Sequence, residues 1–271
     1  MSVLCETLEV SVSGYYDWRK RPLSQRAQAD AELAGQIQAV HAATRKMYGS
    51  PRVHGELQAQ GIKVARKRVA RLMREHGLAG CRPRHRTRTR HSDPSARVAP
   101  NRLNREFTAC RPNEKWSGDI TAIWTYEGWL YLAVVLDLFS RRVVGWAMAA
   151  HQDESLIEAA FRMALLGRHP GTGLLFHSDR GSQYTSDAYQ ALLAEATVTV
   201  SMSRTGNCYD NAVTESFFGT LKAECVEGVC FQSRAQARQA IFEYTECFYN
   251  RIRRHSSLGY QSPIVYEQLM C

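Results

Sequence analysis

The sequence of 271 residues contains no apolar run that approaches the ~20 consecutive residues needed to cross a bilayer. Its start, MSVLCETLEV, carries Glu6 and Glu9 and lacks the basic region and apolar core of a secretory signal peptide. Internal repeats and leucine heptads are also absent. The lack of a bilayer-spanning run and of a signal peptide argues against a membrane or secreted protein, and it predicts that the chain stays in the cytoplasm.

Closely spaced cysteine pairs are missing as well. The eight cysteines are scattered, and none forms a C-x-x-C pair, so we expect reduced thiols rather than a disulfide framework. Cys81, His85, His91 and Cys110 are residue types that bind zinc, but their spacing contains no tight ligand pair. We interpret them as solvated linker residues, because loose matches of this kind are mostly false.

Positive charge is concentrated at one end of the chain. Residues 1–105 contain 21 Lys and Arg against 8 Asp and Glu, a net charge of +13. Residues 106–271 contain 14 Lys and Arg against 18 Asp and Glu, a net charge of −4. A basic segment of this kind favours binding of a polyanion, and nucleic acid is the expected partner.

The basic region is predicted to be helical. The spacing of apolar residues predicts helices over residues 24–44, 51–57 and 64–76, with Gly61 and Gly77 as breaks. Two short helices joined by a glycine turn suggest a helix-turn-helix, although an ordinary amphipathic helix with a solvated basic face fits equally well. The last helix has a basic stripe, which is a candidate DNA-binding surface formed by Lys63, Lys67, Arg71 and Arg74.

The next segment, residues 81–105, is interpreted as a linker. Residues 81–100 read CRPRHRTRTRHSDPSARVAP and have no apolar face. An arginine-rich run can lie along a phosphate backbone and add salt-dependent affinity, and a solubilising spacer is the alternative. Because the run joins a basic helical unit to a larger body, we favour contact with DNA through Arg84, Arg86 and Arg88.

From Trp116 onward, the pattern is that of an α/β protein. The predicted strands cover residues 116–125, 131–139, 141–149, 174–179 and 197–203. The predicted helices cover residues 153–167, 185–196, 210–225 and 233–250, with another near the C-terminus. The first three strands follow one another closely, which predicts an antiparallel meander, whereas intervening helices predict parallel neighbours for the others. The expected fold is a mixed sheet with flanking helices.

Three carboxylates can meet in such a fold. Asp119 lies inside the first strand, where a charge is costly without a partner. Asp179 ends an apolar strand, and Glu215 projects from a helix on the side away from its apolar stripe. Acids from two strands and one helix form an oxygen cage for hard divalent cations such as Mg²⁺ or Mn²⁺. A pair of such ions suits phosphodiester chemistry, because they activate an attacking oxygen and stabilise a leaving one.

Three residues near these acids are candidates for supporting roles. Lys222, further along the helix of Glu215, is a candidate DNA contact, although a lone helix lysine is commonly solvated. His177 lies two residues before Asp179 and either orients the site or is a hydrogen-bonded core histidine. Asn211 lies four residues before Glu215, on the same side of the helix, and is expected to support it.

Asp137 is a fourth acid, on the second predicted strand. We interpret it as a turn cap or a supporting residue paired with Arg141 or Arg142 rather than as a further ligand. A group of residues late in the chain is expected to combine packing with contacts to the DNA backbone: Tyr249, Asn250, Arg253 and His255.

The spacing of the acids resembles a known signature. Asp119 and Asp179 are 60 positions apart, and 35 residues separate Asp179 from Glu215. This resembles the D, D-35-E signature of bacterial insertion-sequence transposases and retroviral integrases. The surrounding strings strengthen the resemblance: WSGDIT, LDLFSRRVVGW, HSDRGSQYTS, SRTGNCYDNAVTESFFGTLKAE and YNRIRRHSSLGYQSPIVYE.

The resemblance covers nearly the whole chain. It is closest to elements whose transposase is encoded by two overlapping frames, and this chain resembles the second, catalytic frame. It implies a helix-turn-helix-like region at about 48–80 within residues 1–80, and a ribonuclease H-like integrase core over residues 106–271. The implied activity is nicking at the ends of an insertion sequence and transfer of the freed 3′-hydroxyl to another DNA phosphodiester.

The resemblance also implies cofactors, partners and site residues. Asp119, Asp179 and Glu215 would be the catalytic metal ligands, with two Mg²⁺ or Mn²⁺ ions, and Lys222 would contact DNA. The partners would be double-stranded DNA of the element ends and target, and the upstream-frame protein. A dimer or larger assembly on DNA, associated with the bacterial nucleoid, is expected.

Two other functions fit parts of the sequence. A different metal nuclease on the same fold would use the same acids, but the basic N-terminal unit and the 35-residue spacing argue against it. A catalytically inactive DNA-binding repressor derived from a transposase is the alternative from another class. The presence of all three acids and of Lys222 argues against that repressor.

Overall fold

The computed structural model describes residues 2–81, 99–204 and 208–270. The chain separates into two compact units, one formed by residues 1–80 and one by residues 81–271. The linker residues Arg84, Arg86 and Arg88 lie outside the described part of the chain, as do His85 and His91. No helix in the described residues is long and apolar enough to cross a membrane.

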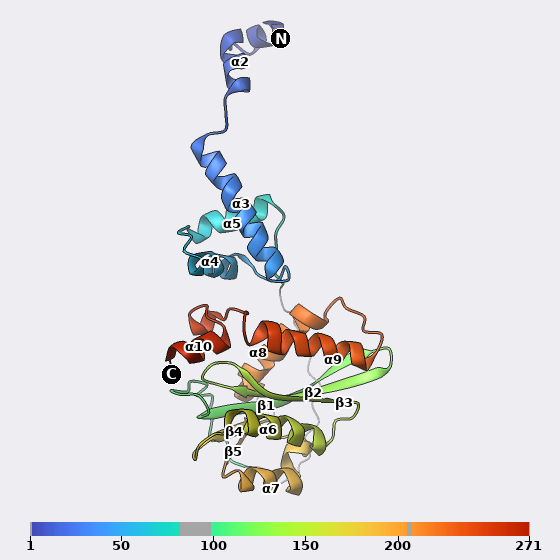
Figure 1. Cartoon of the computed structure of the whole chain (residues 1–271). Coiled ribbons are helices and arrows are strands. Elements are labelled where there is room, and N and C mark those ends of the chain that lie inside the picture. The colour runs from blue at the N-terminus through green and yellow to red at the C-terminus, as the bar shows by residue number, and fades with distance from the viewer. Residues whose placement is uncertain (1, 82–98, 205–207, 271) are drawn as a thin grey trace. The chain divides into compact units, whose positions relative to one another are not determined.

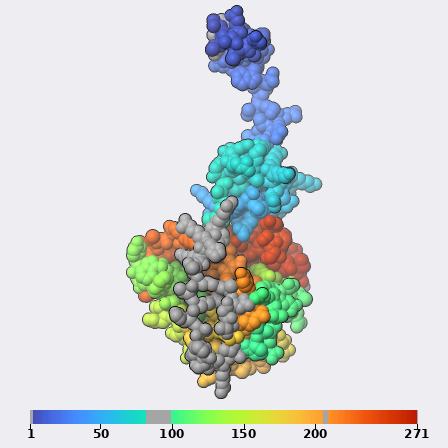
Figure 2. Space-filling model, turned by 180° about the vertical axis from the view of Figure 1, so that it is seen from behind, coloured from blue at the N-terminus to red at the C-terminus, as the bar shows by residue number. Residues whose placement is uncertain are grey.

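The first unit is entirely helical. Its helices are α1 (Ser2–Thr7), α2 (Val12–Lys20), α3 (Gln25–Ala43), α4 (Ser50–Ala59) and α5 (Arg66–Glu75). The last three confirm the helices expected from apolar spacing. Helices α1 and α2 were not predicted. Helix α2 buries no residue, so its sequence shows no periodic apolar stripe from which a helix could be predicted. The two pack on each other at the N-terminal, dark-blue end of the unit (Figure 2).

Helices α3, α4 and α5 pack on one another around a small apolar core. Its most buried members are Ile37, Val53, Leu57, Val69 and Leu72. The predicted glycine breaks are confirmed, because Gly61 after α4 has φ +81° and Gly77 after α5 has φ +65°. These positive values are easily reached only without a Cβ, so glycine sets where both helices end.

The second unit is a sheet covered by helices. Its strands are β1 (Lys115–Thr125), β2 (Gly128–Asp137), β3 (Val143–Ala149), β4 (Leu175–Ser178) and β5 (Thr199–Met202). Its α-helices are α6 (Glu154–Arg168), α7 (Asp187–Glu195), α8 (Ala212–Leu221), α9 (Arg234–Phe242) and α10 (Pro263–Met270). Helices α8 and α9 continue as π-helical segments over Lys222–Val226 and Glu243–Tyr249.

The strand order is β3-β2-β1-β4-β5. Strands β1, β2 and β3 pair antiparallel, whereas β4 pairs parallel with both β1 and β5. This confirms the predicted meander followed by crossovers. Helices α6 and α7 lie on one face of the sheet, and α8 and α9 lie on the other (Figure 1).

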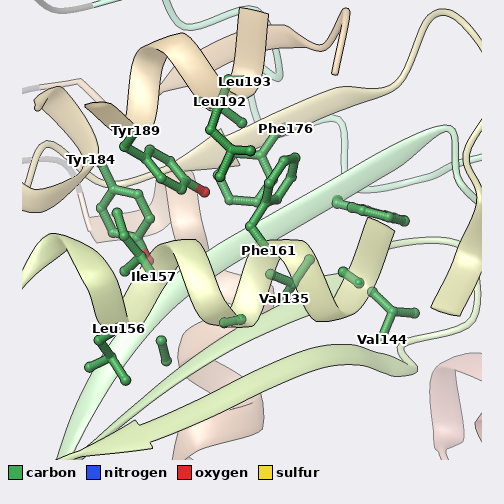
Figure 3. Close-up of a cluster of buried hydrophobic side chains, with 14 of the residues drawn as sticks. Val135, Val144, Leu156, Ile157, Phe161, Phe176, Tyr184, Tyr189, Leu192 and Leu193 are labelled. Atoms are coloured by element: carbon green, nitrogen blue, oxygen red, sulfur yellow. The ribbon is translucent and has the colours of Figure 1, made fainter. Parts of the chain in front are cut away.

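The face covered by α6 and α7 is filled by an apolar cluster rich in aromatic rings. Figure 3 shows Phe161 of α6 between the sheet and α7, directed at Phe176 and Tyr189. The rings of Phe161 and Phe176 meet edge to face, with centroids 5.1 Å apart. Burial of each such side chain contributes about 1.5–3 kcal/mol. This face therefore supplies much of the stability of the second unit.

Candidate active site and DNA-binding surfaces

Strand β1 presents two chemically different faces. Trp116 belongs to the aromatic cluster, and a Cβ at Gly118 would meet the ring of Phe176, so the even positions face α6 and α7. Successive side chains of a strand point to opposite faces. Ser117 and Asp119 therefore face the α8 side, where Asp119 is buried at 5% exposure.

Asp179 directly follows β4, the parallel neighbour of the strand that carries Asp119. In the parallel pair of β1 and β4, Ser117 is opposite His177. The strand pairing ends there; the same register continued by two residues would set Asp119 opposite Asp179, and neighbouring strands lie roughly 4.8 Å apart. The Asp179 carboxylate accepts a hydrogen bond from the backbone N–H of Gly181 at 3.0 Å, which steadies the turn that follows β4.

Glu215 is carried by α8, which is held to β1 by hydrogen bonds. The Ser117 hydroxyl donates to Oδ1 of Asn211 at 2.6 Å, and the Thr214 hydroxyl donates to Ser117 at 2.8 Å. Nδ2 of Asn211 donates to the carbonyl of Gly118 at 3.4 Å. Asn211 precedes the helix but does not cap it with its side chain, which is used on β1 instead. The bond from Thr214 therefore attaches α8 to β1 at the residue next to Glu215.

The three acids are thus carried by neighbouring elements: β1, the end of β4, and α8, which packs on β1. Within the described ranges, however, no three His, Cys, Asp or Glu side chains are grouped closely enough to hold a metal ion. The fold places the strand of Asp119 next to the strand that Asp179 follows, and packs the helix of Glu215 on β1, without a closed set of three ligands. Their role as ligands stays a prediction, and so does DNA contact by Lys222, which follows α8.

His177 is a fully buried histidine with two hydrogen-bond partners. Its Nδ1 lies 2.9 Å from the hydroxyl of Ser201, and its Nε2 lies 3.1 Å from that of Ser203. Burial lowers the pKa of His177 to about 4, so the ring is neutral at ordinary pH. Of the two roles considered, these contacts favour the core histidine, which ties β4 to β5.

Asp137 belongs to a different cluster from the three acids. It pairs with Trp116 across the β1–β2 ladder, so it faces the α6 side of the sheet. Its carboxylate accepts hydrogen bonds from the backbone N–H groups of Asn113 and Phe139, at 2.8 and 2.9 Å, and from the Trp116 indole at 3.3 Å. Burial raises the pKa of Asp137, against the effect of those backbone donors.

The prediction that Asp137 pairs with Arg141 or Arg142 was wrong. Its ion pair is with Arg168 at 3.5 Å, not with Arg141 or Arg142. Arg168 comes from the end of α6 and also pairs with Glu267 of α10 at 2.9 Å. The periodicity of a strand cannot reveal this partner, because 31 positions separate it from Asp137. The turn-capping part of the interpretation agrees with the bond from Phe139.

The group late in the chain is buried. Tyr249, Asn250, Arg253 and His255 are between 1% and 9% exposed. Arg253 forms two hydrogen bonds of 2.8 Å with the carboxylate of Glu224, which follows α8. The packing role is confirmed, but the guanidinium of Arg253 is paired within the core and is not presented to a DNA backbone.

Asp210 was not recognised from the sequence. Its side chain is fully buried in the turn that precedes α8, and it pairs with Arg204 and Arg105 at 3.1 and 3.0 Å. Burial alone would raise the pKa of Asp210, but the bonds from these two guanidinium groups outweigh it and lower the pKa well below its ordinary value. The one available signal was its place beside Asn211, at the start of the predicted catalytic helix.

The basic stripe of the first unit divides into two groups. Arg71 pairs with Asp30 of α3 at 2.6 Å, so it holds two helices together. Lys63, Lys67 and Arg74 are exposed, and in the described part of the chain none of them forms an ion pair. These three residues remain available to a polyanion, whereas the structure assigns Arg71 a packing role.

Comparison with known families defines the class of the protein. The family described as Integrase core domain matches residues 109–208, and a second family with that description matches residues 215–270. The family described as HTH-like domain matches residues 28–86. Together with the strand order, these matches identify a ribonuclease H-like integrase core preceded by a helix-turn-helix-like region, which confirms the predicted fold class.

Two relatives narrow the assignment. The chain is 43% identical over 266 residues to the Insertion element IS600 uncharacterized 31 kDa protein of Shigella sonnei, covering 98% of this chain and 97% of that protein. It is 42% identical over 269 residues to Transposase InsF for insertion sequence IS3A of Escherichia coli (strain K12), covering 98% and 93%. The chain belongs to the IS3 family of insertion-sequence transposases. It is therefore a polynucleotidyl transferase of the DDE type, as the resemblance implied.

Solved structures give a more distant likeness. A simian T-cell lymphotropic virus intasome in complex with PP2A regulatory subunit B56 gamma has 14% identity and a TM-score of 0.49, covering 85% of this chain and 74% of that one. The HTLV-2 integrase catalytic core domain in complex with magnesium has 15% identity and a TM-score of 0.43, covering 58% and 97%. Membership of the family rests on the sequence relatives.

Proposed function

We propose that this transposase nicks DNA at the ends of its insertion sequence and joins the freed 3′-hydroxyl to another DNA phosphodiester. Asp119, Asp179 and Glu215 are the catalytic residues and metal ligands of this proposal. The observation that supports it most is the parallel pairing of β1 with β4, the strand that carries Asp119 and the strand that Asp179 follows, together with the packing of α8 against β1.

The donor chemistry of the three acids fits Mg²⁺ or Mn²⁺. All three offer carboxylate oxygens, which hard divalent cations prefer, and His177 is occupied by two serines. When bound, two ions would activate the attacking oxygen and stabilise the leaving one. Water and DNA phosphate oxygens commonly complete the shell of Mg²⁺, so three protein ligands are sufficient. The chain would contribute the negative charge of the three carboxylates.

The division of labour along the chain is part of the proposal. Residues 1–80 bind DNA, mainly through the helix-turn-helix-like part at 48–80, residues 81–105 form a basic linker, and residues 106–271 form the catalytic core. The exposed Lys63, Lys67 and Arg74 support the first assignment. Arg84, Arg86 and Arg88 would add phosphate contacts from the linker, and Lys222 would hold DNA near the acids.

Partners beyond DNA follow from the reaction. Both ends of an element must be cut together, so we propose that the active species is a dimer or larger assembly on DNA. The upstream-frame protein is the proposed second partner. It would supply the dimerising coiled coil, because this chain has no leucine-heptad segment.

The test is metal-dependent nicking and joining of DNA that carries the element ends. Wild type is compared with Asp119→Asn, Asp179→Asn and Glu215→Gln, each with and without the upstream-frame protein. Glu195→Gln is the matched control, because Glu195 is an exposed carboxylate at the end of α7 on the opposite face. The proposal expects joining by wild type and by the control, and none by the three other variants.

Two results would redirect the proposal. If wild type binds DNA but never cuts it, with the partner and either metal present, the protein is an inactive DNA-binding repressor. If wild type cuts but never joins strands, it is a nuclease. Retention of joining by any of the three acid variants would remove that residue from the ligand set.

The DNA-binding surface has its own test. Lys67→Gln with Arg74→Gln removes two exposed charges, and Lys46→Gln removes an exposed charge from the loop before α4. Each phosphate contact contributes about 0.9 to the slope of log affinity against log salt concentration. The double variant should lower that slope by about 2 and Lys46→Gln should leave it unchanged. If wild type and all variants show the same salt dependence, DNA does not bind at Lys67 and Arg74.

A further inference from the structure

The first described residues after the linker are bonded to the core. The hydroxyl of Ser201 on β5 accepts hydrogen bonds from the backbone N–H groups of Arg102 and Leu103, at 2.9 and 3.0 Å. The side chain of Leu103 is 2% exposed. The same Ser201 hydroxyl contacts His177, so this short segment is fixed to β5 and, through it, to β4.

Asp210 collects bonds from two sides of the core. From the segment after the linker, Nδ2 of Asn101 donates to it at 2.9 Å, and Nε of Arg105 donates at 3.0 Å. From the end of β5, the backbone N–H and the guanidinium of Arg204 donate at 2.9 and 3.1 Å. The guanidinium of Arg105 also lies over the ring of Tyr209, 5.6 Å from its centroid. Arg105 thus contacts two adjacent residues of the turn Cys208–Asn211, Tyr209 and Asp210.

This turn leads directly into the predicted catalytic helix. Asn211 follows Asp210, bonds to Ser117 and Gly118 on β1, and is the last residue before α8. Glu215 lies four residues later, one turn along the helix. A continuous series of bonds therefore runs from Arg105 through Asp210 and Asn211 to the helix that carries Glu215.

We propose that Asp210 is a positioning residue that ties the exit of the basic linker to α8, so that the anchored linker helps to set the place of Glu215. Arg105 and Asn101 are its partners on the linker side. The inference rests on the proposed function, because it takes Glu215 as a ligand. Its consequence is that the end of the DNA-binding linker supports catalysis in addition to binding DNA.

Substitutions of two neighbouring arginines can distinguish a positioning role of Arg105 from a general effect of its positive charge on DNA binding. Arg102 and Arg105 lie in the same segment and both are exposed. Arg105 pairs with Asp210, whereas in the described residues the side chain of Arg102 forms no ion pair. Arg105→Gln and Arg102→Gln therefore remove the same charge from the same segment, but only the first breaks the bond to Asp210.

The experiment compares these variants in the full chain with the upstream-frame protein. Three quantities are measured: DNA affinity, the joining rate at saturating DNA, and the Mg²⁺ concentration at half-maximal rate. Hydrogen exchange of residues 212–221 is followed as well, because it reports on α8 without requiring activity. Asp210→Asn and the conservative Arg105→Lys complete the series.

Residues that orient metal ligands typically change affinity or activity by about 10- to 100-fold. We expect Arg105→Gln to lower the saturated joining rate by about 10-fold or more and to raise the half-maximal Mg²⁺ concentration, with faster exchange of α8. Arg105→Lys should recover part of the rate, and Asp210→Asn should resemble Arg105→Gln. Arg102→Gln should change DNA affinity as much as Arg105→Gln and leave the saturated rate and the exchange of α8 as in wild type.

The outcomes distinguish the two proposals. Equal joining rates and equal exchange of α8 in Arg105→Gln and Arg102→Gln would overturn the role of Asp210. If wild type itself does not join DNA, the proposed function fails. The exchange of α8 still decides in that case whether Arg105 and Asp210 hold the helix.

Discussion

The two faces of the central sheet differ in how they hold their helices. On one face, α6 packs by shape: a Cβ at Gly145 of β3 would collide with the backbone of Ala160, so the helix lies directly on the strand. On the other face, α8 is held by two hydrogen bonds of Ser117, which donates to Asn211 and accepts from Thr214. The first face is mainly apolar, with Asp137 and Arg168 as a buried polar pair at its edge, whereas the second carries hydrogen bonds between β1 and α8.

The comparison teaches how one strand serves two purposes. Successive side chains of β1 point alternately into the aromatic core and toward the polar side of the sheet. Residues that stabilise the fold therefore alternate along the strand with candidate site residues. Hydrogen bonds hold α8 on its β1 side, and its apolar residues Phe217, Phe218 and Leu221 are buried as well. Substitutions on the two faces should therefore affect different measurements.

The largest loss of stability is expected on the apolar face. Phe161→Ala removes a fully buried ring from the aromatic cluster and should lower the free energy of unfolding by about 3–5 kcal/mol. Denaturant unfolding measures it. Leu166→Ala on the same helix is the control, since Leu166 is 74% exposed. A comparable loss in both variants, or a fall in activity per folded molecule for Phe161→Ala, would contradict the separation of the faces.

A smaller loss is expected from added volume at β1. In Gly118→Ala the new Cβ would lie 2.6 Å from Cζ of Phe176, and overpacking of this kind costs about 1–3 kcal/mol. Gly167→Ala on α6 is the control, because a Cβ there meets nothing within 4 Å. It should be neutral or stabilising by up to ~1 kcal/mol. Thermal unfolding of both proteins decides, and an unchanged midpoint for Gly118→Ala would show that the ring of Phe176 can yield.

On the polar face, a modest loss of stability should accompany a large loss of activity. Thr214→Val keeps the shape of a buried side chain but removes the donor to Ser117, at a cost of about 1 kcal/mol. The joining rate should fall by about 10-fold or more, because the helix of Glu215 loses one of its bonds to β1. Thr220→Val on the same helix is the control. Full activity of Thr214→Val would mean that the bond between Thr214 and Ser117 is not needed to position α8.

The smallest effect is expected at the surface of the first unit, and it depends on pH. Hydrogen bonds from Arg71 and Arg68 lower the pKa of Asp30. The ionised carboxylate therefore stabilises this unit above its ordinary pKa of 3.8, and this contribution is lost as pH falls through the lower, folded value.

The measurement is hydrogen exchange of α3 at neutral and acidic pH. Asp30→Asn should exchange faster than wild type near pH 7, with the difference shrinking toward low pH. Glu32→Gln, a substitution of an exposed carboxylate on the same helix, should match wild type. A difference between Asp30→Asn and wild type that grows on acidification would reverse the assigned sign.

Much of the fold followed from local patterns. The helices α3 to α8 and the five strands lie within a few residues of their predicted positions, because periodic burial leaves a periodic sequence. The helical hairpin of α1 and α2 was missed for the same reason, since α2 buries nothing. Strand β2 was predicted to begin at Tyr131 but begins at Gly128, because Trp129 is 47% exposed and has no apolar alternation to mark it.

The sequence by itself determined which elements form, where charge is concentrated, and the spacing of Asp119, Asp179 and Glu215. These are properties of short segments, or of a family pattern that the chain carries in full. The tertiary structure alone decided the partners: Arg168 for Asp137, two serines for His177, and Arg105 for Asp210. Such pairs join residues 24 to 105 positions apart, and no local periodicity encodes a contact that exists only after the sheet and its helices have packed.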